Sequence, residues 1–305
     1  MTAPIVHPTA PRSDLACPEL RIAPDADGSL TITPERTGWR YLTFRVVTLG
    51  AGETAEAGAP DREALVVPIA GGGAVVRPLD HPVIDLPDRL TPFDALPTSV
   101  YLPAGRPATI SGRPIGAAAD DRVTVAIAEA PATGRGEAAT EPFVIGAGDL
   151  EIEIRGAGDA TRQITKILRP ESPADRLLVV EALTPSGNRS SWPPHKHDVD
   201  AMPEEAVLEE IYYYRFRRPG GSGEQRIYRG DRSRDCTFEV HTGECILVTD
   251  GYHPFQAAPD DDAWYLNALA GDRRTMACSF DPELSWINGT WASMATDPRI
   301  PMVTR

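Results

Sequence analysis

Two histidines one residue apart, His195 and His197, lie in the stretch WPPHKHD of a chain that contains only six histidines. Side chains of a strand alternate between its two faces, so both imidazoles would project to one side and Lys196 to the other. Two imidazoles on one face can share a metal ion. An isolated HxH is also typical of a solvated turn, so its meaning depends on the other ligands that the chain can bring to it.

A carboxylate and a third histidine could complete such a site. In the segment LEEIYYYRF, strand alternation places Glu210 on one face and Glu209 on the other. His253 follows Gly251 in the turn TDGYHP and could approach from a later strand. Imidazoles with one carboxylate form a mixed nitrogen and oxygen set that suits Zn²⁺, Mn²⁺, Fe²⁺ or Ni²⁺ better than Ca²⁺ or Mg²⁺. We expect a divalent metal, with zinc or manganese as the first choices.

Several polar side chains near these ligands are candidates for catalysis or substrate binding. Tyr212 and Tyr214 share the predicted face of the glutamate, and Tyr252 directly precedes the later histidine, so all three could relay protons. Asn267, in YLNALAG, could line the substrate pocket, although a packing role fits it equally well. Structural roles suffice for the remaining histidines, which are His7, His81 and His241.

Short β-strands are the elements that must position these side chains. One series of β-type segments runs from residue 29 to 130 and a second from 151 to 271, each bounded by Gly, Pro, Asn or Asp. The 30 prolines and 26 glycines among 305 residues fit the many turns required, and helical periodicity is almost absent. We therefore predict an all-β chain, a sandwich or barrel rather than an alternating α/β fold.

The two series share one matching element. VYLPAGRPATI in the first and CILVTDGYHPFQA in the second both run from strand through a glycine turn to strand, with GYH in the second where the first has GRP. This indicates an internal duplication in which only the second copy has a histidine. The first series offers Glu63 but no histidine near it, so we expect no metal site there.

Composition limits the partners. The formal net charge of −14 argues against nucleic acid and anionic membranes, so an anionic substrate would need a local basic pocket. No stretch approaches 18 uninterrupted apolar residues, and the N-terminus lacks the pattern of a secretory signal, so we expect a cytoplasmic protein. The four cysteines are far apart without a CxxC pair, and we interpret them as separate buried or incidental thiols.

These motifs also support one resemblance. In order and spacing, SGNRSSWPPHKHD, LEEIYYYRF, QRIYRGDRS, VTDGYHP and YLNALAG resemble the 5-deoxy-glucuronate isomerase family of inositol catabolism, a bicupin group related to the uronate ketol-isomerases of pectin breakdown. The resemblance covers roughly residues 35–295. It implies two cupin barrels, which we place at 29–155 (without metal) and 156–295 (metal-binding), with an arm at 1–28 and a tail at 296–305.

The resemblance also implies a ligand set. The cupin pattern of an HxH pair, a glutamate and a later histidine falls on His195, His197, Glu210 and His253. It selects the second glutamate of LEE and leaves Glu209 out. Two features depart from a general cupin: DVDAMPEEAVLE is inserted between the HxH pair and the glutamate, and Thr249 replaces the usual proline of the later turn.

The implied reaction is an aldose to ketose interconversion, from 5-deoxy-D-glucuronate to 5-dehydro-2-deoxy-D-gluconate, with the metal as Lewis acid and no redox cofactor. The substrate carboxylate needs a fork-shaped donor, for which we choose Arg226 in QRIYRG, with Arg229 and Arg232 behind it. An isomerase for the pectin-derived deoxy-hexosulose uronate and a sugar-binding cupin without catalysis remain alternatives. A homo-oligomer, such as a two-fold dimer, would cover exposed sheet edges.

Overall fold

The computed structural model describes residues 15–113, 122–134 and 138–305. Strands dominate these residues, as predicted, and the helices in them are short: η1 (Cys17–Leu20), α1 (Pro34–Thr37), η2 (Gly158–Ala160) and η3 (Ser285–Ser293). Helix α1 begins at a proline, whose fixed φ suits the first turn, and ends at Gly38 with a φ of 72°. None of the helices in the described part of the chain has the length and apolar character needed to span a membrane.

The first half of the chain forms two antiparallel sheets. Its strands are β2 (Leu30–Ile32), β3 (Thr43–Leu49), β4 (Thr54–Ala57), β5 (Arg62–Gly71), β6 (Ala74–Pro78), β7 (Ile84–Leu86), β8 (Ser99–Leu102), β9 (Ala108–Gly112), β10 (Val123–Pro131) and β11 (Phe143–Ile145). A six-stranded sheet has the order β11-β8-β5-β10-β3-β2, and a four-stranded sheet has the order β4-β9-β6-β7.

The second half repeats this plan. Its strands are β12 (Glu151–Arg155), β13 (Arg162–Leu168), β14 (Leu178–Thr184), β15 (Arg189–Ser190), β16 (His195–Lys196), β17 (Glu209–Phe216), β18 (Ser222–Tyr228), β19 (Asp235–His241), β20 (Cys245–Val248), β21 (Phe255–Ala257), β22 (Ala263–Ala270) and β23 (Ser279–Phe280), joined by β1 (Arg21–Ile22). The large sheet has the order β1-β20-β17-β22-β14-β13-β12, the small one β15-β21-β18-β19, and β16 pairs with β23.

The strand orders of the halves match position by position. In the large sheets β8-β5-β10-β3-β2 corresponds to β20-β17-β22-β14-β13, and in the small sheets β4-β9-β6-β7 corresponds to β15-β21-β18-β19. The glycine turns predicted to match join β8 to β9 and β20 to β21, and their glycines, Gly105 and Gly251, have φ values of 86° and 85°. This agreement supports the internal duplication inferred from the sequence.

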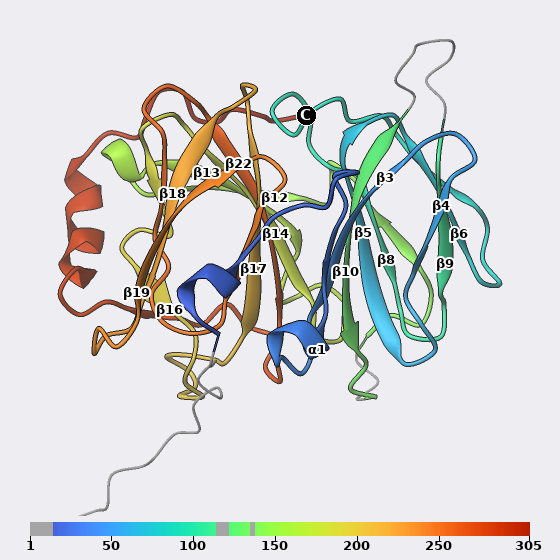
Figure 1. The fold of residues 1–305 in the computed structure, drawn as a ribbon, viewed down its shortest axis with the longest axis horizontal. Coiled ribbons are helices and arrows are strands. Elements are labelled where there is room, and N and C mark those ends of the chain that lie inside the picture. The colour runs from blue at the N-terminus through green and yellow to red at the C-terminus, as the bar shows by residue number, and fades with distance from the viewer. Residues whose placement is uncertain (1–14, 114–121, 135–137) are drawn as a thin grey trace, which may run out of the picture.

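The two large sheets pack against each other in the middle of the molecule, and the small sheets lie on the outer sides (Figure 1). Phe44 of β3 and Tyr213 of β17 meet across this interface, with ring centroids 6.1 Å apart. Both residues belong to one hydrophobic core that is continuous across the halves. Burial of apolar area is the main stabilising contribution here, so the halves form one unit rather than two loosely linked ones.

Two glutamates, Glu63 (buried) and Glu209 (partly buried), join the halves to each other reciprocally. Glu63 of β5 accepts hydrogen bonds from the backbone N–H groups of residues 175–177 at 2.6–2.8 Å and from the Tyr101 hydroxyl at 2.6 Å. Glu209 of β17 accepts from the backbone N–H groups of residues 40–42 at 2.6–3.0 Å. Each recipient segment immediately precedes the corresponding strand of the other half, β14 or β3. The same contact is therefore made twice, once in each direction.

A buried ion pair adds a third link between the halves. The guanidinium of Arg89, which follows β7, donates two hydrogen bonds to Glu181 of β14 at 2.6 and 2.8 Å. Both side chains are almost inaccessible, with 3% and 4% of their surface exposed. A charge-assisted, two-pronged pair of this kind fixes geometry as well as contributing energy.

The structure adds three features at the N-terminal arm and at the boundary between the halves. Strand β1 pairs with β20, so residues 21 and 22 extend the large sheet of the second half. A disulfide joins Cys17 to Cys236, which corrects our interpretation of these cysteines as separate thiols; only Cys245 and Cys278 are free among the described residues. Strand β12 pairs with β13, which places residues 151–155 in the sheet of the second half and not of the first.

Candidate metal centre

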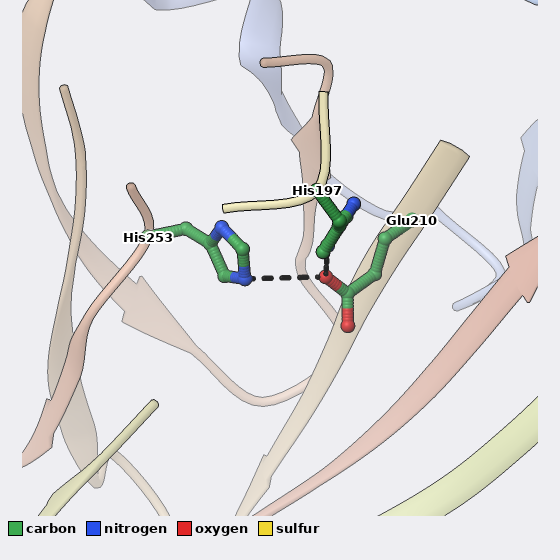
Figure 2. Close-up of side chains that lie close together, drawn as sticks. All are labelled: His197, Glu210 and His253. Carbon is green, nitrogen blue, oxygen red and sulfur yellow. Dashed lines mark hydrogen bonds and ion pairs between the residues drawn. The ribbon is translucent and has the colours of Figure 1, made fainter. Parts of the chain in front are cut away.

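Strand pairing in the second half brings three candidate ligands together. Glu210 of β17 lies opposite Val248, the last residue of β20, and the turn that follows β20 carries His253. His197 comes directly after β16, and its backbone carbonyl accepts a hydrogen bond from the N–H of Leu208 at 3.0 Å, just before β17 begins. The three side chains converge from three different segments (Figure 2).

The ligand atoms of His197, Glu210 and His253 lie within 4.8 Å of one another, and all three residues are buried. Nε2 of His197 is 2.8 Å from Oε2 of Glu210, and Nε2 of His253 is 3.3 Å from the same oxygen (Figure 2). Although this second distance suits an ion pair, Nε2 of His253 has no hydrogen-bond partner. A fully buried nitrogen lone pair directed at a carboxylate is costly unless a cation satisfies both groups.

The outer nitrogens of both imidazoles are held by backbone carbonyls. Nδ1 of His197 lies 3.0 Å from the Leu208 oxygen, and Nδ1 of His253 lies 3.1 Å from the Gly251 oxygen. A carbonyl can only accept, so each Nδ1 carries a proton, and Nε2 is the atom of each ring that faces the centre and could bind a metal. Metal-binding histidines are commonly oriented in this way. The residues present therefore fit a divalent metal with nitrogen and oxygen ligands.

His195, the fourth predicted ligand, lies beside this group of three. Its ring centroid is 4.6 Å from that of His253 and 6.4 Å from that of His197. Its own ligand atoms fall outside the set that lies within 4.8 Å. The structure thus brings three of the four predicted ligands together and places the fourth imidazole against them.

Burial controls the protonation of these histidines. It lowers the pKa of His253 to about 4, against the opposing charge of Glu210. Burial also lowers the pKa of His195 well below its ordinary value, with further lowering from the neighbouring imidazoles His253 and His197. Burial acts in the same direction on His197, but its hydrogen bond to Glu210 outweighs this and raises the pKa. Two of the three imidazoles are therefore neutral at physiological pH, the state that binds a metal.

Lys196 projects away from the centre, as strand alternation predicted, and anchors the HxH segment. Its ammonium donates to Asp198 at 2.6 Å and to Glu205 at 2.8 and 2.9 Å. Glu205 belongs to the insertion that separates the HxH pair from its glutamate, and it is buried. Asp198 also accepts the N–H of Gly251 at 2.9 Å, which ties the HxH segment to the turn that carries His253. The insertion thus fixes the ligand geometry.

Two adjacent cavities open beside the centre, one of about 480 Å³ and one of about 360 Å³. The larger is within the range typical of small-molecule sites. Both cavities are lined by Arg155, Arg162, His195, Glu210 and Met276. A small polar ligand in this space would touch the candidate ligands and two arginines.

The other predicted site residues divide into two groups. Tyr212 and Asn267 line the larger cavity. Tyr214 and Tyr252 line neither cavity: the Tyr214 hydroxyl donates to Gln225 inside the sheet packing, and Tyr252 packs against a neighbouring tyrosine ring.

Arg226, our choice of carboxylate receptor, lines neither of the two cavities. Its guanidinium donates to Asp235 at 2.6 and 2.7 Å, and its side chain is 40% exposed. Arg226 lies on a strand of the small sheet, and its side chain turns to the surface, where its guanidinium is already paired with the carboxylate of Asp235. Arg229 is likewise paired, with Asp250 at 2.7 Å.

Among the residues of the larger cavity that sequence reasoning missed are Arg155, Arg162, Ser191 and Tyr265. Tyr265 lies two residues before Asn267 on β22, so strand alternation could have identified it. Ser191 has a φ of 48°, an uncommon value for a residue with a side chain, and its hydroxyl lies 2.6 Å from that of Tyr212. No local pattern distinguishes the two arginines from solvated ones.

Comparison with known proteins gives consistent results. A family model described as the KduI/IolB family matches residues 20–287. A 5-deoxy-glucuronate isomerase of Geobacillus kaustophilus is 39% identical over 268 residues, which cover 87% of this chain and 92% of the relative. One from Listeria innocua is 34% identical and covers 88% of this chain and 94% of its own length.

Solved structures agree with the fold. An IolB-like protein from Salmonella typhimurium superimposes with a TM-score of 0.80 at 34% identity, over 88% of this chain and 99% of that one. An oxalate decarboxylase of Lactobacillus farciminis superimposes with a TM-score of 0.57 at 13% identity over 90% of each chain, which shows a shared bicupin fold alone. On the strength of this sequence and structural similarity over most of its length, the chain belongs to the KduI/IolB family.

Proposed function

We propose that the protein is a metal-dependent aldose-ketose isomerase that converts 5-deoxy-D-glucuronate to 5-dehydro-2-deoxy-D-gluconate. The relatives named 5-deoxy-glucuronate isomerase supply the substrate, and the candidate metal centre supplies the chemistry. The observation that carries the proposal is the buried, unpartnered Nε2 of His253 directed at Oε2 of Glu210. Together with His197, these groups form a ligand set beside a cavity large enough for an open-chain sugar acid.

The reaction transfers a hydrogen from C2 to C1 of the open-chain sugar and moves a proton from the C2 hydroxyl to the C1 oxygen, so no electrons leave the substrate. A divalent metal, when bound, supplies a Lewis acid that polarises the carbonyl oxygen. His197, Glu210 and His253 would hold it, with His195 beside them. Zinc and manganese both suit this mixed ligand set.

Tyr212 and Ser191 are placed to manage the hydroxyl protons. Their oxygens lie 2.6 Å apart, and both residues line the larger cavity beside Glu210. Burial, followed by the charge of Glu210, raises the pKa of Tyr212 well above its ordinary value, so the phenol keeps its proton at physiological pH. Tyr212 therefore acts as a proton donor and not as a base. The Ser191 hydroxyl can pass a proton between this phenol and a sugar oxygen.

The test is an anaerobic assay with 5-deoxy-D-glucuronate in which aldehyde loss and ketone appearance are followed by proton NMR. We expect conversion by protein loaded with Zn²⁺ or Mn²⁺, loss of conversion after chelator treatment, and recovery when the metal is returned. His253→Ala should lose both metal and turnover. Glu224→Ala, a change at an exposed residue of β18, serves as the matched control and should retain both.

Two results would contradict the proposal. Conversion that survives complete metal removal would exclude the metal-dependent mechanism. No conversion with any divalent metal, while the pectin-derived deoxy-hexosulose uronate is isomerised, would assign the protein to the related ketol-isomerase reaction instead.

A further inference from the structure

Four cationic side chains line the larger cavity, although the protein as a whole is acidic. Three of them are already engaged by two glutamates of β12, Glu151 and Glu153, with N···O distances between 2.6 and 3.1 Å. The engaged cations are Arg155, Lys166 and Arg169. Their charge is therefore largely balanced before any ligand arrives.

Arg162, the first residue of β13, is the exception. It is 4% exposed and forms no ion pair with any residue that the structure describes. Its Nη1 donates to the Ala160 carbonyl at 2.9 Å, and its guanidinium lies 5.7 Å from the ring centroid of Trp291. Burial lowers the pKa of Arg162 to about 10, so the group is still charged at neutral pH. Most of its N–H donors remain available to the cavity.

A buried charge without a counter-ion is strongly unfavourable. The cost is increased here because Arg162 pairs directly with Arg155 across β12 and β13, and like charges opposite each other destabilise a sheet. Glu153 pairs with Arg155 and Lys166 and forms no ion pair with Arg162. An anion bound between the two arginines would offset both costs at once.

We propose that Arg162, assisted by Arg155, is the receptor for the carboxylate of the substrate. Both arginines line both cavities together with His195 and Glu210, so an acid held by its carboxylate at Arg162 extends toward the metal centre with its carbonyl end. The planar guanidinium matches a carboxylate with two parallel hydrogen bonds. This inference rests on the proposed function, because it assigns one end of the same substrate.

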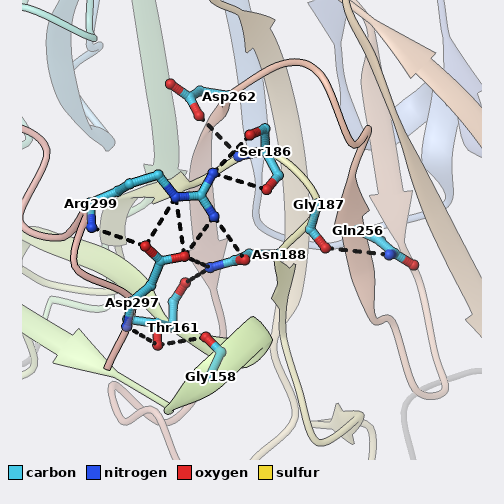
Figure 3. Close-up of polar contacts among 9 residues, drawn as sticks. All are labelled: Gly158, Thr161, Ser186, Gly187, Asn188, Gln256, Asp262, Asp297 and Arg299. Carbon is cyan, nitrogen blue, oxygen red and sulfur yellow. Dashed lines mark hydrogen bonds and ion pairs between the residues drawn. The ribbon is translucent and has the colours of Figure 1, made fainter. Parts of the chain in front are cut away.

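The start of β13 is held rigidly, which a receptor requires. Thr161 precedes Arg162, and its carbonyl accepts from the Asn188 amide at 2.9 Å, while its hydroxyl accepts the N–H of Asp297 at 3.0 Å (Figure 3). Asp297 in turn binds the guanidinium of Arg299 (Figure 3). Asn188 and Asp297 are therefore positioning residues for the receptor.

The activity test compares two substrates in wild-type and variant proteins. Arg162→Met should lower kcat/KM for 5-deoxy-D-glucuronate about 100-fold, the scale expected for losing hydrogen bonds between charged groups. Arg162→Lys, which keeps the charge but loses the fork, should lower it about 10-fold. With 5-deoxy-D-glucose, which has a neutral CH₂OH group in place of the carboxylate, wild type and Arg162→Met should differ less than about threefold, since the interaction with the carboxylate is absent in both.

Controls separate recognition from damage to the fold. Metal content should be unchanged in Arg162→Met, because Arg162 is not a ligand, and thermal unfolding should show a folded protein. Arg77→Met, a change at an exposed arginine of β6 in the first half, should leave kinetics and metal content as in wild type. If Arg162→Met alone fails to fold, Arg162→Lys and Arg162→Gln provide the same comparison.

A binding measurement distinguishes failure of this inference from failure of the proposed function. Calorimetry of metal-loaded protein with D-glucuronate and D-glucose should show tighter binding of the acid in wild type and loss of that preference in Arg162→Met. This result would stand even if 5-deoxy-D-glucuronate were not converted. An undiminished preference for the acid in Arg162→Met, with turnover intact, would overturn the inference and place the carboxylate elsewhere.

Discussion

The two halves of the molecule have the same strand order, yet among the described residues only the second half brings together side chains that could hold a metal ion. Inside the first half, the space between the sheets is filled by apolar side chains, including Val66, Leu102, Ile110 and Ile127. Inside the second half, the corresponding space holds imidazoles, a carboxylate and the two cavities. The scaffold is thus compatible with either a packed or a polar interior, and a few positions decide which one forms.

Equivalent positions show how small the difference is. Ala64 pairs with Leu102, the last residue of β8, just as Glu210 pairs with Val248, the last residue of β20. Where the second half has the candidate ligand Glu210, the first half therefore has the methyl group of Ala64. The residues immediately before them, Glu63 and Glu209, keep the same role in both halves. The glutamate that binds the other half is thus present in both halves, whereas the interior carboxylate is present only in the second.

The largest effect should come from making the second half resemble the first at this position. Glu210→Ala removes the carboxylate shared by both imidazoles, so we expect loss of bound metal and a fall in turnover of at least about 1,000-fold, since a Lewis acid contributes several kcal/mol to a transition state. Metal analysis and the NMR assay measure the two quantities. Retention of stoichiometric metal would show that Glu210 is not a ligand.

The ion pair between the halves should give the next largest effect. Arg89→Met leaves Glu181 buried without a partner, so we expect the free energy of unfolding in urea to fall by about 3–5 kcal/mol. Arg89→Met combined with Glu181→Leu removes both charges and should cost much less. Equal losses in the single and double variants would mean that packing, and not the stranded charge, is responsible.

The reciprocal glutamates allow the symmetry of the interface to be tested. Glu63→Ala leaves three backbone N–H groups and the Tyr101 hydroxyl without their acceptor, so we expect a loss of about 3 kcal/mol of unfolding free energy. Glu209→Ala strands three N–H groups at a less buried site and should cost about 2 kcal/mol. Urea unfolding measures both. A larger loss for Glu209→Ala would contradict the ranking.

The smallest expected effect is a pH dependence of the tail, which has no counterpart in the first half. The hydrogen bond to Arg299 is the main cause that lowers the pKa of Asp297 to about 2. A carboxyl group whose pKa is lower in the folded than in the unfolded protein stabilises the fold at pH values above its unfolded pKa, near 3.9. This stabilisation is lost as the pH falls toward 2. The difference in stability between wild type and Asp297→Asn should therefore be constant above about pH 5 and shrink below about pH 4. A difference that does not change with pH would exclude this origin.

Much of this architecture could be predicted because strand alternation is a local rule. It correctly separated Glu210 from Glu209, directed Lys196 away from the centre and placed Tyr212 at the cavity. The roles of individual arginines could not be predicted in this way. Arg226 and Arg162 both lie on strands, and what distinguishes them is the presence or absence of a nearby carboxylate, which depends on three-dimensional pairing.

Long-range pairing also explains the remaining differences. The disulfide joins cysteines separated by 219 residues, and no spacing rule reaches so far. Strand β12 follows a connection whose composition is typical of a linker. Only the pairing of β12 with β13 therefore shows to which sheet this strand belongs. Both features depend on contacts across the sheet and not on neighbours in the sequence.

The placement of β1 has a consequence for how the chain folds during synthesis. This strand leaves the ribosome first, but its partner β20 is made only after the whole first half and most of the second. Closing so long a loop carries an entropic cost that must be met before the pairing stabilises anything. The first half can close its own sheets meanwhile, whereas β1 has no partner until β20 has been made. A variant lacking residues 15–22 would leave the edge of β20 permanently open to pairing with other chains.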